Sequence, residues 1–561
     1  MSEVAETLET NESLGGASPT RWWRNEVLLI AGVALIATAA GLLLMWILGV
    51  VGCDMPAHAY KTELMRTGHS IFWDNLWYGG VYGPISYGLI YYWVTVFVPA
   101  VVVTLIASTA LPVCLLLYLR AMGNKRARAA AITLALVMGI YVTHGQNPFL
   151  LAMAFAMAGM ALVAAGRPVL AALPFAAAIF TNPLAIVVAA PFLLAGFVAR
   201  RDQRRSLLVF AACLAPFILV EGALMFLFSQ PTWYVANFSV LLKVLIFCAA
   251  GLVFALLSRA FGARFWRTYF MVYAVMCLAA FALTGLALGD NVARAFQLLG
   301  IALLVAVDGV RLPRWVILPV IALAGFVQLA NPASNFLHTE WYAANNKAFW
   351  TPPLAALARL DDGQHRLHVV TTKKHSEAYF VPLAGVAMTR GWFRQADAVH
   401  NKLFTHSFGA KDAHEYIAWL RSMGVEYVLW PHVALDYSSQ AEPGILASSN
   451  MFTVVAQGPK WTIYRLRGAQ ALVTPLTASA SGVAAKVTAF DNDQVVLDLP
   501  RPGAYEVRFS WSPYWRVSQG RAQVTRAKDD FIVVHASAAG RVVLRHTVTF
   551  KTITERLSSL L

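Results

Sequence analysis

Eleven long apolar stretches between residues 27 and 331 constrain this chain more than any other feature of its sequence. They centre on 27–51, 99–120, 127–142, 148–165, 168–180, 184–199, 206–229, 235–258, 267–288, 292–310 and 315–331. A helix needs about 20 apolar residues to cross the hydrocarbon core of a bilayer. Only 13% of the residues are charged, whereas soluble globular chains have about 25%. The pattern predicts a polytopic α-helical membrane protein with about eleven transmembrane helices. The fifth and sixth stretches are short and are separated by Thr181, Asn182 and Pro183, which predicts a tight hairpin or a broken pair of helices.

The distribution of Lys and Arg among the short loops predicts the orientation of these helices. With the N-terminus inside, the inner segments carry sixteen Lys and Arg, whereas the outer segments carry three, namely Lys61, Arg66 and Arg294. We therefore expect a multi-pass protein of the cytoplasmic (inner) membrane, with its N-terminus inside and its C-terminal part outside. Most of the net charge of +15 then belongs to the inner face, so the basic composition gives no reason to expect a nucleic-acid partner.

Four regions follow from the pattern along the chain. Residues 412–423 have helical spacing and precede a strand-like run at 425–430, whereas 505–509 and 531–535 alternate as strands do. We predict a polar cytoplasmic tail at 1–24, a transmembrane domain at 25–332, an extracytoplasmic α/β domain at 333–470 and an extracytoplasmic β-sandwich at 471–561.

The first outer loop, residues 52–98, holds the most informative polar residues. Asp54 follows the first apolar stretch by a few residues, so it is expected at the outer membrane surface. His58 would share a face with it if residues 55–66 form a helix. A carboxylate near a histidine suits general-base catalysis on a hydroxyl group.

The same loop is rich in aromatic side chains, with polar groups among them. Flat rings suit sugar faces, and interspersed carboxylate and amide groups suit sugar hydroxyls. The candidate residues are Trp73, Asp74, Asn75, Trp77 and Tyr78. Alternatively, the rings form an interfacial belt and Asp54 caps a surface helix.

Directly after the first apolar stretch, the order Asp54, His58, Gly68, Trp73-Asp74, Trp77-Tyr78-Gly79-Gly80, Pro84 and Tyr87 resembles membrane proteins of the glycosyltransferase C superfamily. The sequence is most similar to the branch labelled 6-pyruvoyl-tetrahydropterin-synthase-related, a label that implies no pterin chemistry. The stretch Ser512-Pro513-Tyr514-Trp515-Arg516-Val517 is similar to the extracytoplasmic tail of related bacterial proteins. Together these similarities cover about two-thirds of the chain.

The resemblance implies an activity and a catalytic residue. Superfamily members transfer sugars from polyprenyl-phosphate donors at the outer membrane face, with an acidic residue of the first outer loop as base. That role would belong to Asp54. The chain departs from many members because Cys53 and Met55, rather than a second acid, flank this residue.

A donor phosphate would need a cation near the outer surface. Arg294 and Lys61 are the candidates; alternatively, Arg294 extends to lipid headgroups or pairs with Asp290. His144 lies on another outer turn and is expected to be incidental.

Two ionisable residues fall inside apolar stretches at similar predicted depth, Glu221 and Lys243. Charges in hydrocarbon are costly unless they are paired, so we expect an intramembrane pair that is either functional or locks two helices together.

The leading hypothesis is a membrane glycosyltransferase that moves a sugar from a polyprenyl-phosphate donor to an envelope glycan or glycolipid, with membrane lipids as further partners. Asp54 would be the base, assisted by His58 and Asp74. Two alternatives remain, a transporter of a lipid-linked intermediate centred on Glu221 and Lys243, and a non-catalytic envelope-assembly scaffold. The sequence contains no phosphate-cradling glycine motif and no zinc-type histidine pair, so no metal or cofactor is expected.

Overall fold

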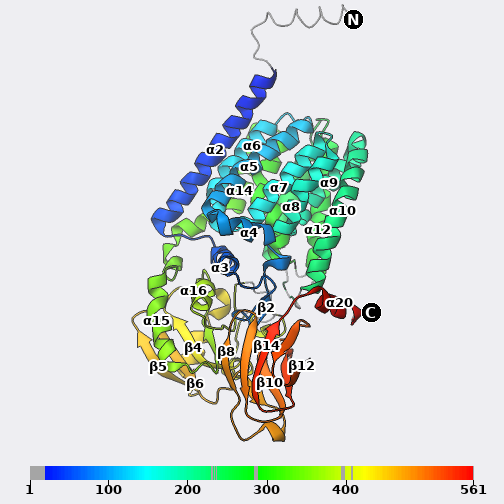
Figure 1. Ribbon diagram of the computed structural model, residues 1–561. Coiled ribbons are helices and arrows are strands. Elements are labelled where there is room, and N and C mark those ends of the chain that lie inside the picture. Colours follow the sequence, from blue (N-terminus) through cyan, green and yellow to red (C-terminus); the bar gives the residue numbers. More distant parts are fainter. Residues whose placement is uncertain are drawn as a thin grey trace, which may run out of the picture.

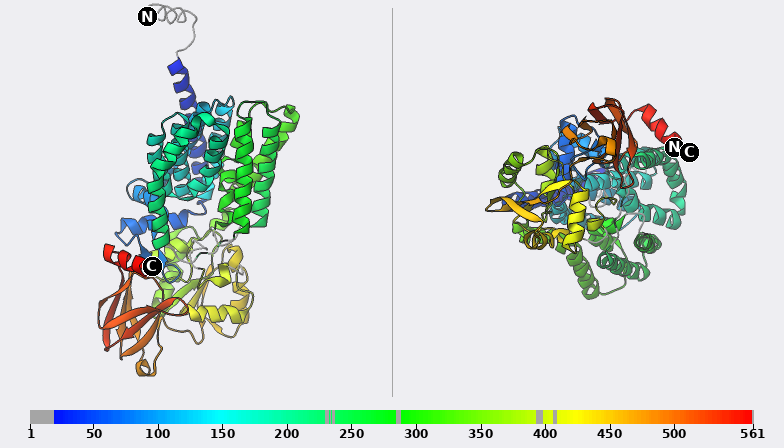
Figure 2. Two further views of the ribbon diagram at one scale, coloured as in Figure 1. Left: turned by 90° about the vertical axis from the view of Figure 1, so that its right-hand side faces the viewer. Right: turned by 90° about the horizontal axis from the view of Figure 1, so that it is seen from below.

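Helices form one end of the molecule and β sheets form the other (Figure 1). The computed structural model describes residues 19–228, 232, 234, 237–283, 288–392, 398–405 and 409–559. Figure 1 and the side view on the left of Figure 2 place the start of α2 at the end of the helical part that is farthest from the sheets.

Within the described residues, nine helices are long and apolar enough to cross a membrane. They contain α2 (Pro19–Leu48), α5 (Ala100–Ala121), α6 (Ala127–Tyr141), α7 (Asn147–Ala164), α10 (Arg204–Leu227), α11 (Phe238–Leu256), α12 (Ala263–Ala282), α13 (Arg294–Ala306) and α14 (Arg314–Leu337). Adjoining 3-10 turns extend the spans of α6, α10 and α13 to Ala127–His144, Arg201–Leu227 and Gly289–Ala306. Two shorter apolar helices, α8 (Pro168–Thr181) and α9 (Leu184–Ala199), complete the set. The predicted polytopic helical architecture is therefore confirmed.

Packing separates the helices into buried and peripheral ones. Most of α7 is buried, because α5 and α8 pack along it, whereas α2, α10 and α14 expose most of their apolar length. Large side chains such as Trp46 and Leu219 are more than two-thirds exposed on these outer helices. Apolar surface of this extent suits contact with lipid rather than with water.

The break between α8 and α9 is held by one buried amide. Asn182 accepts a hydrogen bond from the backbone N–H of Leu184 at 3.0 Å and donates to the hydroxyl of Tyr87 at 3.1 Å. Pro183 cannot continue α8 because it has no N–H. Beyond this point the two helices take different neighbours, since α8 packs on α7 and α9 packs on α12. Of the two alternatives, the structure therefore has a broken pair of helices, and the Asn182 side chain at the break reaches Tyr87 of the outer loop.

A mixed four-stranded sheet follows the membrane helices. Its strand order is β3-β4-β6-β5, with β3 parallel to β4 and the other pairs antiparallel. The strands are β3 (Arg366–Val369), β4 (Val425–Pro431), β5 (Phe452–Gly458) and β6 (Trp461–Leu466). The main helices around it are α15 (Lys347–Leu360), α16 (Glu377–Leu383), α18 (Ala413–Ser422) and α19 (Glu442–Ser448). Asp412 caps α18 by accepting from the N–H of Glu415, which explains the start of the predicted helix.

Two antiparallel four-stranded sheets complete the β-rich end, with orders β12-β13-β10-β7 and β11-β14-β9-β8. Their strands are β7 (Val473–Pro475), β8 (Lys486–Phe490), β9 (Gln494–Leu499), β10 (Gly503–Ser510), β11 (Trp515–Gln519), β12 (Ala522–Arg526), β13 (Phe531–Ala536) and β14 (Gly540–His546). Side chains of both sheets share one buried core, as in a β-sandwich. The final helix, α20 (Phe550–Ser558), lies beside the lower end of α10 in Figure 1.

The outer loop joins the two ends of the molecule. It contains α3 (Met55–Arg66), the short hairpin of β1 (Trp73–Asp74) and β2 (Val81–Tyr82), and α4 (Leu89–Phe97). Figure 1 shows α3 and α4 between the membrane helices and the sheets. This placement brings polar residues of the loop to the junction where a candidate site is found.

Candidate functional site

A close contact between two backbone turns fixes the position of Asp54. The backbone N–H of Asp54 donates to the carbonyl oxygen of His144 at 3.2 Å, in the turn after α6. Gly52 and Gly145 face each other there, and a Cβ added to Gly52 would lie 2.4 Å from the Cα of Gly145. Since no side chain fits at that distance, two glycines are what allow the turns to meet. The link between α2 and α3 is thereby held against the end of α6.

The Asp54 carboxylate meets a tryptophan from the β-rich end. The indole N–H of Trp392 donates to Oδ1 of Asp54 at 3.2 Å. Burial raises the pKa of Asp54, while the charge of Arg294 and this hydrogen bond act in the opposite direction. As whole residues, Asp54 and Trp392 are half-buried and both keep part of their surface accessible.

Arg294, at the start of α13, supplies the nearby positive charge. Its Nε donates to Oδ1 of Asn291 at 2.8 Å, and the guanidinium lies 4.9 Å from the ring centre of Phe149. Its Nη1 is buried and has no hydrogen-bond partner among the described residues. Arg294 and Asp54 influence each other electrostatically, yet the described ion pairs do not include them. The cation and the carboxylate are thus close enough to interact electrostatically but do not form a direct ion pair.

His58 is also close enough to Arg294 to be affected by its charge, and its imidazole is neutral near neutral pH. Its Nδ1 is 3.0 Å from the hydroxyl of Tyr92. Burial, followed by the charge of Arg294, lowers the pKa of His58 to about 3. A neutral imidazole cannot stabilise a phosphate by its charge. It can orient a neighbour or exchange a proton through a hydrogen bond.

Tyr87 connects the site to the membrane helices. Its hydroxyl accepts the Asn182 hydrogen bond from the α8–α9 break. Burial raises the pKa of Tyr87, while Arg294 lowers it and Asp54 raises it, so the phenol lies near both groups. Tyr87 belongs to the order of residues that suggested the family resemblance, but spacing gave it no role. Spacing could not reveal the contact of Tyr87 with Asn182, because the two residues are 95 positions apart in the sequence.

A second cation, which the sequence did not indicate, comes from the loop after β3. Lys374 is buried, and its Nζ donates to Oδ1 of Asn335 at 2.7 Å and to Sγ of Cys53 at 3.3 Å. His144, expected to be incidental, lies close enough to both Lys374 and Arg294 to feel their charges. Its Nε2 is buried without a partner among the described residues.

Trp392 is supported by a histidine in an unusual backbone conformation. The ring of His375 lies 3.8 Å from the Trp392 ring, and His375 has a positive φ of 54°. Glu377 and Asp436 each bring a carboxylate oxygen to 3.6 Å from this imidazole. Positive φ is uncommon for a residue with a side chain and is held here by the surrounding contacts. The indole that meets Asp54 is thus fixed from the β-rich end.

Lys61 and Asp74 are engaged elsewhere. Lys61 Nζ lies 3.2 Å from Oδ2 of Asp74, and both side chains are almost fully buried. Oδ1 of Asp74 accepts from the hydroxyl of Tyr60 at 3.1 Å and from Nδ2 of Asn492 at 2.9 Å. Asn492 belongs to the β8–β9 turn of the sandwich, so this cluster fastens the loop to the sandwich. In this structure Lys61, expected to bind phosphate, and Asp74, expected to assist catalysis, thus form a buried pair with each other, and their expected roles stay predictions.

The aromatic part of the loop is also used for packing. Trp73 is fully buried in the sandwich core, stacked on His546 at 4.7 Å between ring centres. Asn75 accepts from the Trp73 indole at 2.7 Å and donates to the carbonyl of Asp491. Trp77, also fully buried, donates to the carbonyl of Ala378.

Tyr78 is buried too, with a positive φ of 57°, and its carbonyl accepts from Ser510. The residues expected to bind sugar are thus all buried where the loop meets the β-rich end, namely Trp73, Asn75, Trp77 and Tyr78. Their role in sugar binding stays a prediction, which a buried ring does not favour.

The expected intramembrane pair does not form. Glu221 is buried in α10, whereas Lys243 is exposed on α11, and the described ion pairs do not join them. Helix α10 packs mainly on α8, while α11 packs mainly on α12. Equal depth along two helices therefore did not bring the two side chains together, because depth does not decide which helices are neighbours.

One group of side chains in the described part of the chain could share a metal ion. It consists of Asp361, Asp362 and His365 after α15, with ligand atoms within 4.8 Å of one another. His365 is also within 3.0 Å of Glu426. Asp54 is not part of this group.

No protein-family model and no curated protein matches the chain. Among solved structures, the chain is similar to the archaeal oligosaccharyltransferase AglB from Archaeoglobus fulgidus in complex with an inhibitory peptide and a dolichol-phosphate. The TM-score is 0.43 at 12% identity, over 74% of this chain and 70% of that one.

Two other structures of the oligosaccharyltransferase from the same organism are similar at a TM-score of 0.40. One, tethered to an acceptor peptide containing the NVT sequon through a disulfide bond, has 12% identity over 72% of this chain and 69% of that one. The other is the apo form, with 11% identity over the same shares, 72% and 69%. These likenesses concern the overall fold.

Proposed function

We propose that this protein is a membrane glycosyltransferase with Asp54 as its general base, acting on a polyprenyl-phosphate-linked sugar. The observation that carries the proposal is the convergence of the Asp54 carboxylate and the Arg294 guanidinium at the junction of the membrane helices and the outer loop. Arg294 has a buried nitrogen without a hydrogen-bond partner among the described residues, and Asp54 is a half-buried residue that keeps some accessible surface. A base beside an unsatisfied cation suits a hydroxyl nucleophile and a phosphate leaving group.

The reaction that fits these groups is a single displacement. The acceptor hydroxyl gives its proton to the Asp54 carboxylate, and its oxygen forms a bond to the anomeric carbon of the sugar. The bond from that carbon to the phosphate oxygen breaks, and the electron pair leaves with the polyprenyl phosphate. Arg294 neutralises the charge that develops on the phosphate, and inversion at the anomeric carbon follows.

Membrane geometry supports a lipid-linked donor. Asp54 lies six residues after the end of α2, and Arg294 begins α13, so both are at the ends of membrane helices. A polyprenyl chain would remain among the helices while its phosphate reaches this level. An envelope glycan or glycolipid acceptor at the outer face of the cytoplasmic membrane is consistent with the loop charges, which favour the β-rich end outside.

The transporter hypothesis has lost its main support, because Glu221 and Lys243 form no ion pair in the described structure. The lipid-binding and sugar-transfer assays described next distinguish the scaffold hypothesis from the enzyme hypothesis.

The test combines lipid binding with sugar transfer. The purified full-length protein would be analysed by mass spectrometry for co-purified polyprenyl phosphates and assayed with hexosyl and pentosyl polyprenyl phosphates. Asp54→Asn should keep the lipid but lower transfer by at least about 100-fold, the lower range for general-base catalysis. Arg294→Gln should lose the lipid. Asp498→Asn, on the exposed surface of β9, and Arg264→Gln, exposed at the start of α12, are the matched controls.

Full transfer by Asp54→Asn would remove the base assignment. If neither lipid nor transfer is found for the parent protein, while the controls are well folded, the scaffold hypothesis is favoured.

A further inference from the structure

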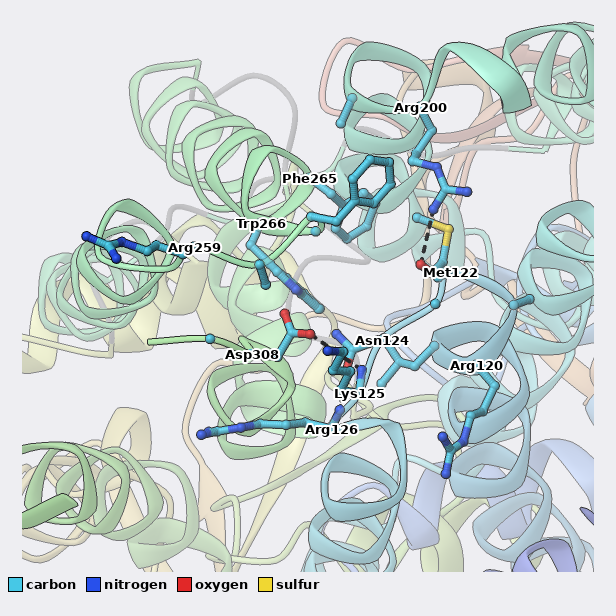
Figure 3. Close-up of a pocket in the computed structure, with 18 residues that line it drawn as sticks. Arg120, Met122, Asn124, Lys125, Arg126, Arg200, Arg259, Phe265, Trp266 and Asp308 are labelled. Carbon is cyan, nitrogen blue, oxygen red and sulfur yellow. Dashed lines mark hydrogen bonds between the residues drawn. The ribbon is translucent and has the colours of Figure 1, made fainter. Parts of the chain in front are cut away.

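A pocket lies at the end of the helical part that is farthest from the sheets, and Figure 3 shows the residues that line it. Its volume is about 820 Å³, within the range of about 300–1,000 Å³ that is usual for small-molecule sites. The wall is built where α5, α9, α11 and α13 end and where α6 and α12 begin. Six helix ends therefore contribute to a single hollow, which has no role in the function proposed above.

Cations dominate the pocket wall. Two of them have carboxylate partners, since Arg120 pairs with Glu26 at 2.9 Å and Arg200 pairs with Asp202 at 2.8 Å. The other three are Lys125, Arg126 and Arg259. In the described part of the chain, none of these three has a carboxylate within ion-pair distance. The pocket therefore has an excess of positive charge, which suits a phosphate group.

One buried carboxylate faces the same space. Asp308 is only 7% exposed, and its Oδ2 lies 3.4 Å from the backbone N–H of Lys125. Its Oδ1 is buried and has no donor among the described residues. Leaving a buried charged acceptor unsatisfied is costly, so this oxygen is a candidate for a ligand N–H. Figure 3 shows Asp308 between Trp266 and Lys125, with the pocket cations around it.

We propose that this pocket binds a headgroup that carries both a phosphate and a primary ammonium, as in phosphatidylethanolamine. The phosphate would lie against Lys125, Arg126 and Arg259, and the ammonium would donate to the free oxygen of Asp308. The indole nitrogen of Trp266 and the free oxygen of Asp308 face the same point of the wall, since each would be 3.9 Å from a Cβ at Gly262.

A membrane lipid is the source that the location favours. Helix ends lie at the depth of the lipid headgroups, and basic pockets between helices bind lipid headgroups in other membrane proteins. Phe261, at the edge of the pocket, is 88% exposed, and Arg200 lies over its ring. An exposed aromatic ring beside a polar pocket suits a ligand with a headgroup in the pocket and acyl chains outside it.

The experiment is a headgroup ranking by native mass spectrometry of the full-length protein in detergent. Phosphatidylethanolamine, phosphatidylglycerol and phosphatidylcholine with identical acyl chains are compared. We expect phosphatidylethanolamine to bind about tenfold more tightly than either, because glycerol lacks the ammonium and choline has no N–H to donate. Free phosphoethanolamine is added as competitor. Competition at micromolar concentration would identify a soluble aminophosphate as the occupant, and its failure would identify the lipid.

Variants separate the two charges. Asp308→Asn should abolish the preference for phosphatidylethanolamine over phosphatidylglycerol, while Lys125→Gln with Arg259→Gln should weaken both lipids. Arg167→Gln, an exposed arginine between α7 and α8, should change neither. Equal or tighter binding of phosphatidylglycerol by the parent protein would overturn the proposal, even if Asp308→Asn did not fold. An effect of Arg167→Gln as large as that of the double variant would reduce the binding to general attraction by surface charge and overturn it as well.

Discussion

Asp74→Ala should destabilise the protein without removing a chemical group from the candidate site. At the 3.2 Å separation of Lys61 Nζ and Asp74 Oδ2, an effective dielectric constant of 20 gives an attraction of about 5 kcal/mol. Loss of one partner from a buried pair costs about 3–5 kcal/mol, because the other charge stays buried. Tyr60 and Asn492 also lose an acceptor. We therefore expect a loss of about 3–5 kcal/mol.

Thermal unfolding of the purified protein in detergent measures this loss, and limited proteolysis shows whether the loop detaches from the sandwich. The matched control is Glu63→Ala, which breaks the exposed Glu63–Arg66 pair on α3, the helix that also carries Lys61. Exposed pairs contribute about 0–1 kcal/mol, so the control should unfold almost like the parent. If Asp74→Ala unfolds like the control but loses sugar transfer as Asp54→Asn does, Asp74 belongs to the chemistry and the structural assignment is wrong.

Three further predictions concern the site and the membrane helices. Trp392→Phe removes a donor that lowers the pKa of Asp54; because the base acts only when deprotonated, the acidic limb of the pH–rate profile should move to higher pH, and an unchanged limb would contradict this. Gly52→Ala would drive a Cβ into Gly145, 2.4 Å away; sugar transfer should fall at least about tenfold as Asp54 is displaced, whereas Gly32→Ala, which meets nothing within 4 Å, should be neutral. Lys243→Met should change the stability in detergent by less than about 0.5 kcal/mol, and a loss above about 2 kcal/mol would show that Lys243 is paired after all.

The membrane part of the fold could be predicted from sequence because its constraint is local. Each spanning helix must satisfy its own backbone hydrogen bonds and present apolar side chains, so composition over about 20 residues is enough to find it. The short helices α8 and α9, which are the fifth and sixth apolar stretches of the sequence, were predicted in the same way, with the break at Asn182 and Pro183. The helix at 413–422 and the strand at 425–431 likewise carry their own signals, a capping residue and a β-rich run.

The candidate site could be predicted only in part. Asp54 and Arg294 were found because each lies next to the end of an apolar stretch, where a lipid-linked phosphate would be. Trp392 could not be found, since it is 338 positions from Asp54 and reaches it only when the sheets dock on the helices. Lys374 could not be predicted either, because it also comes from the β-rich end and is 321 positions from its contact Cys53.

Tertiary structure alone decided the roles of residues whose types were compatible with two uses. An aspartate or tryptophan in the outer loop has the same sequence signal whether it binds a sugar or is buried, and Asp74 and Trp73 proved to be buried against the sandwich. Glu221 and Lys243 were expected to meet because depth follows from position in a helix, but lateral packing separated them. The sequence by itself determined which segments enter the membrane, because that depends on the chain's own composition. Which side chains face one another depends on how distant segments pack, and that is a property of the folded molecule alone.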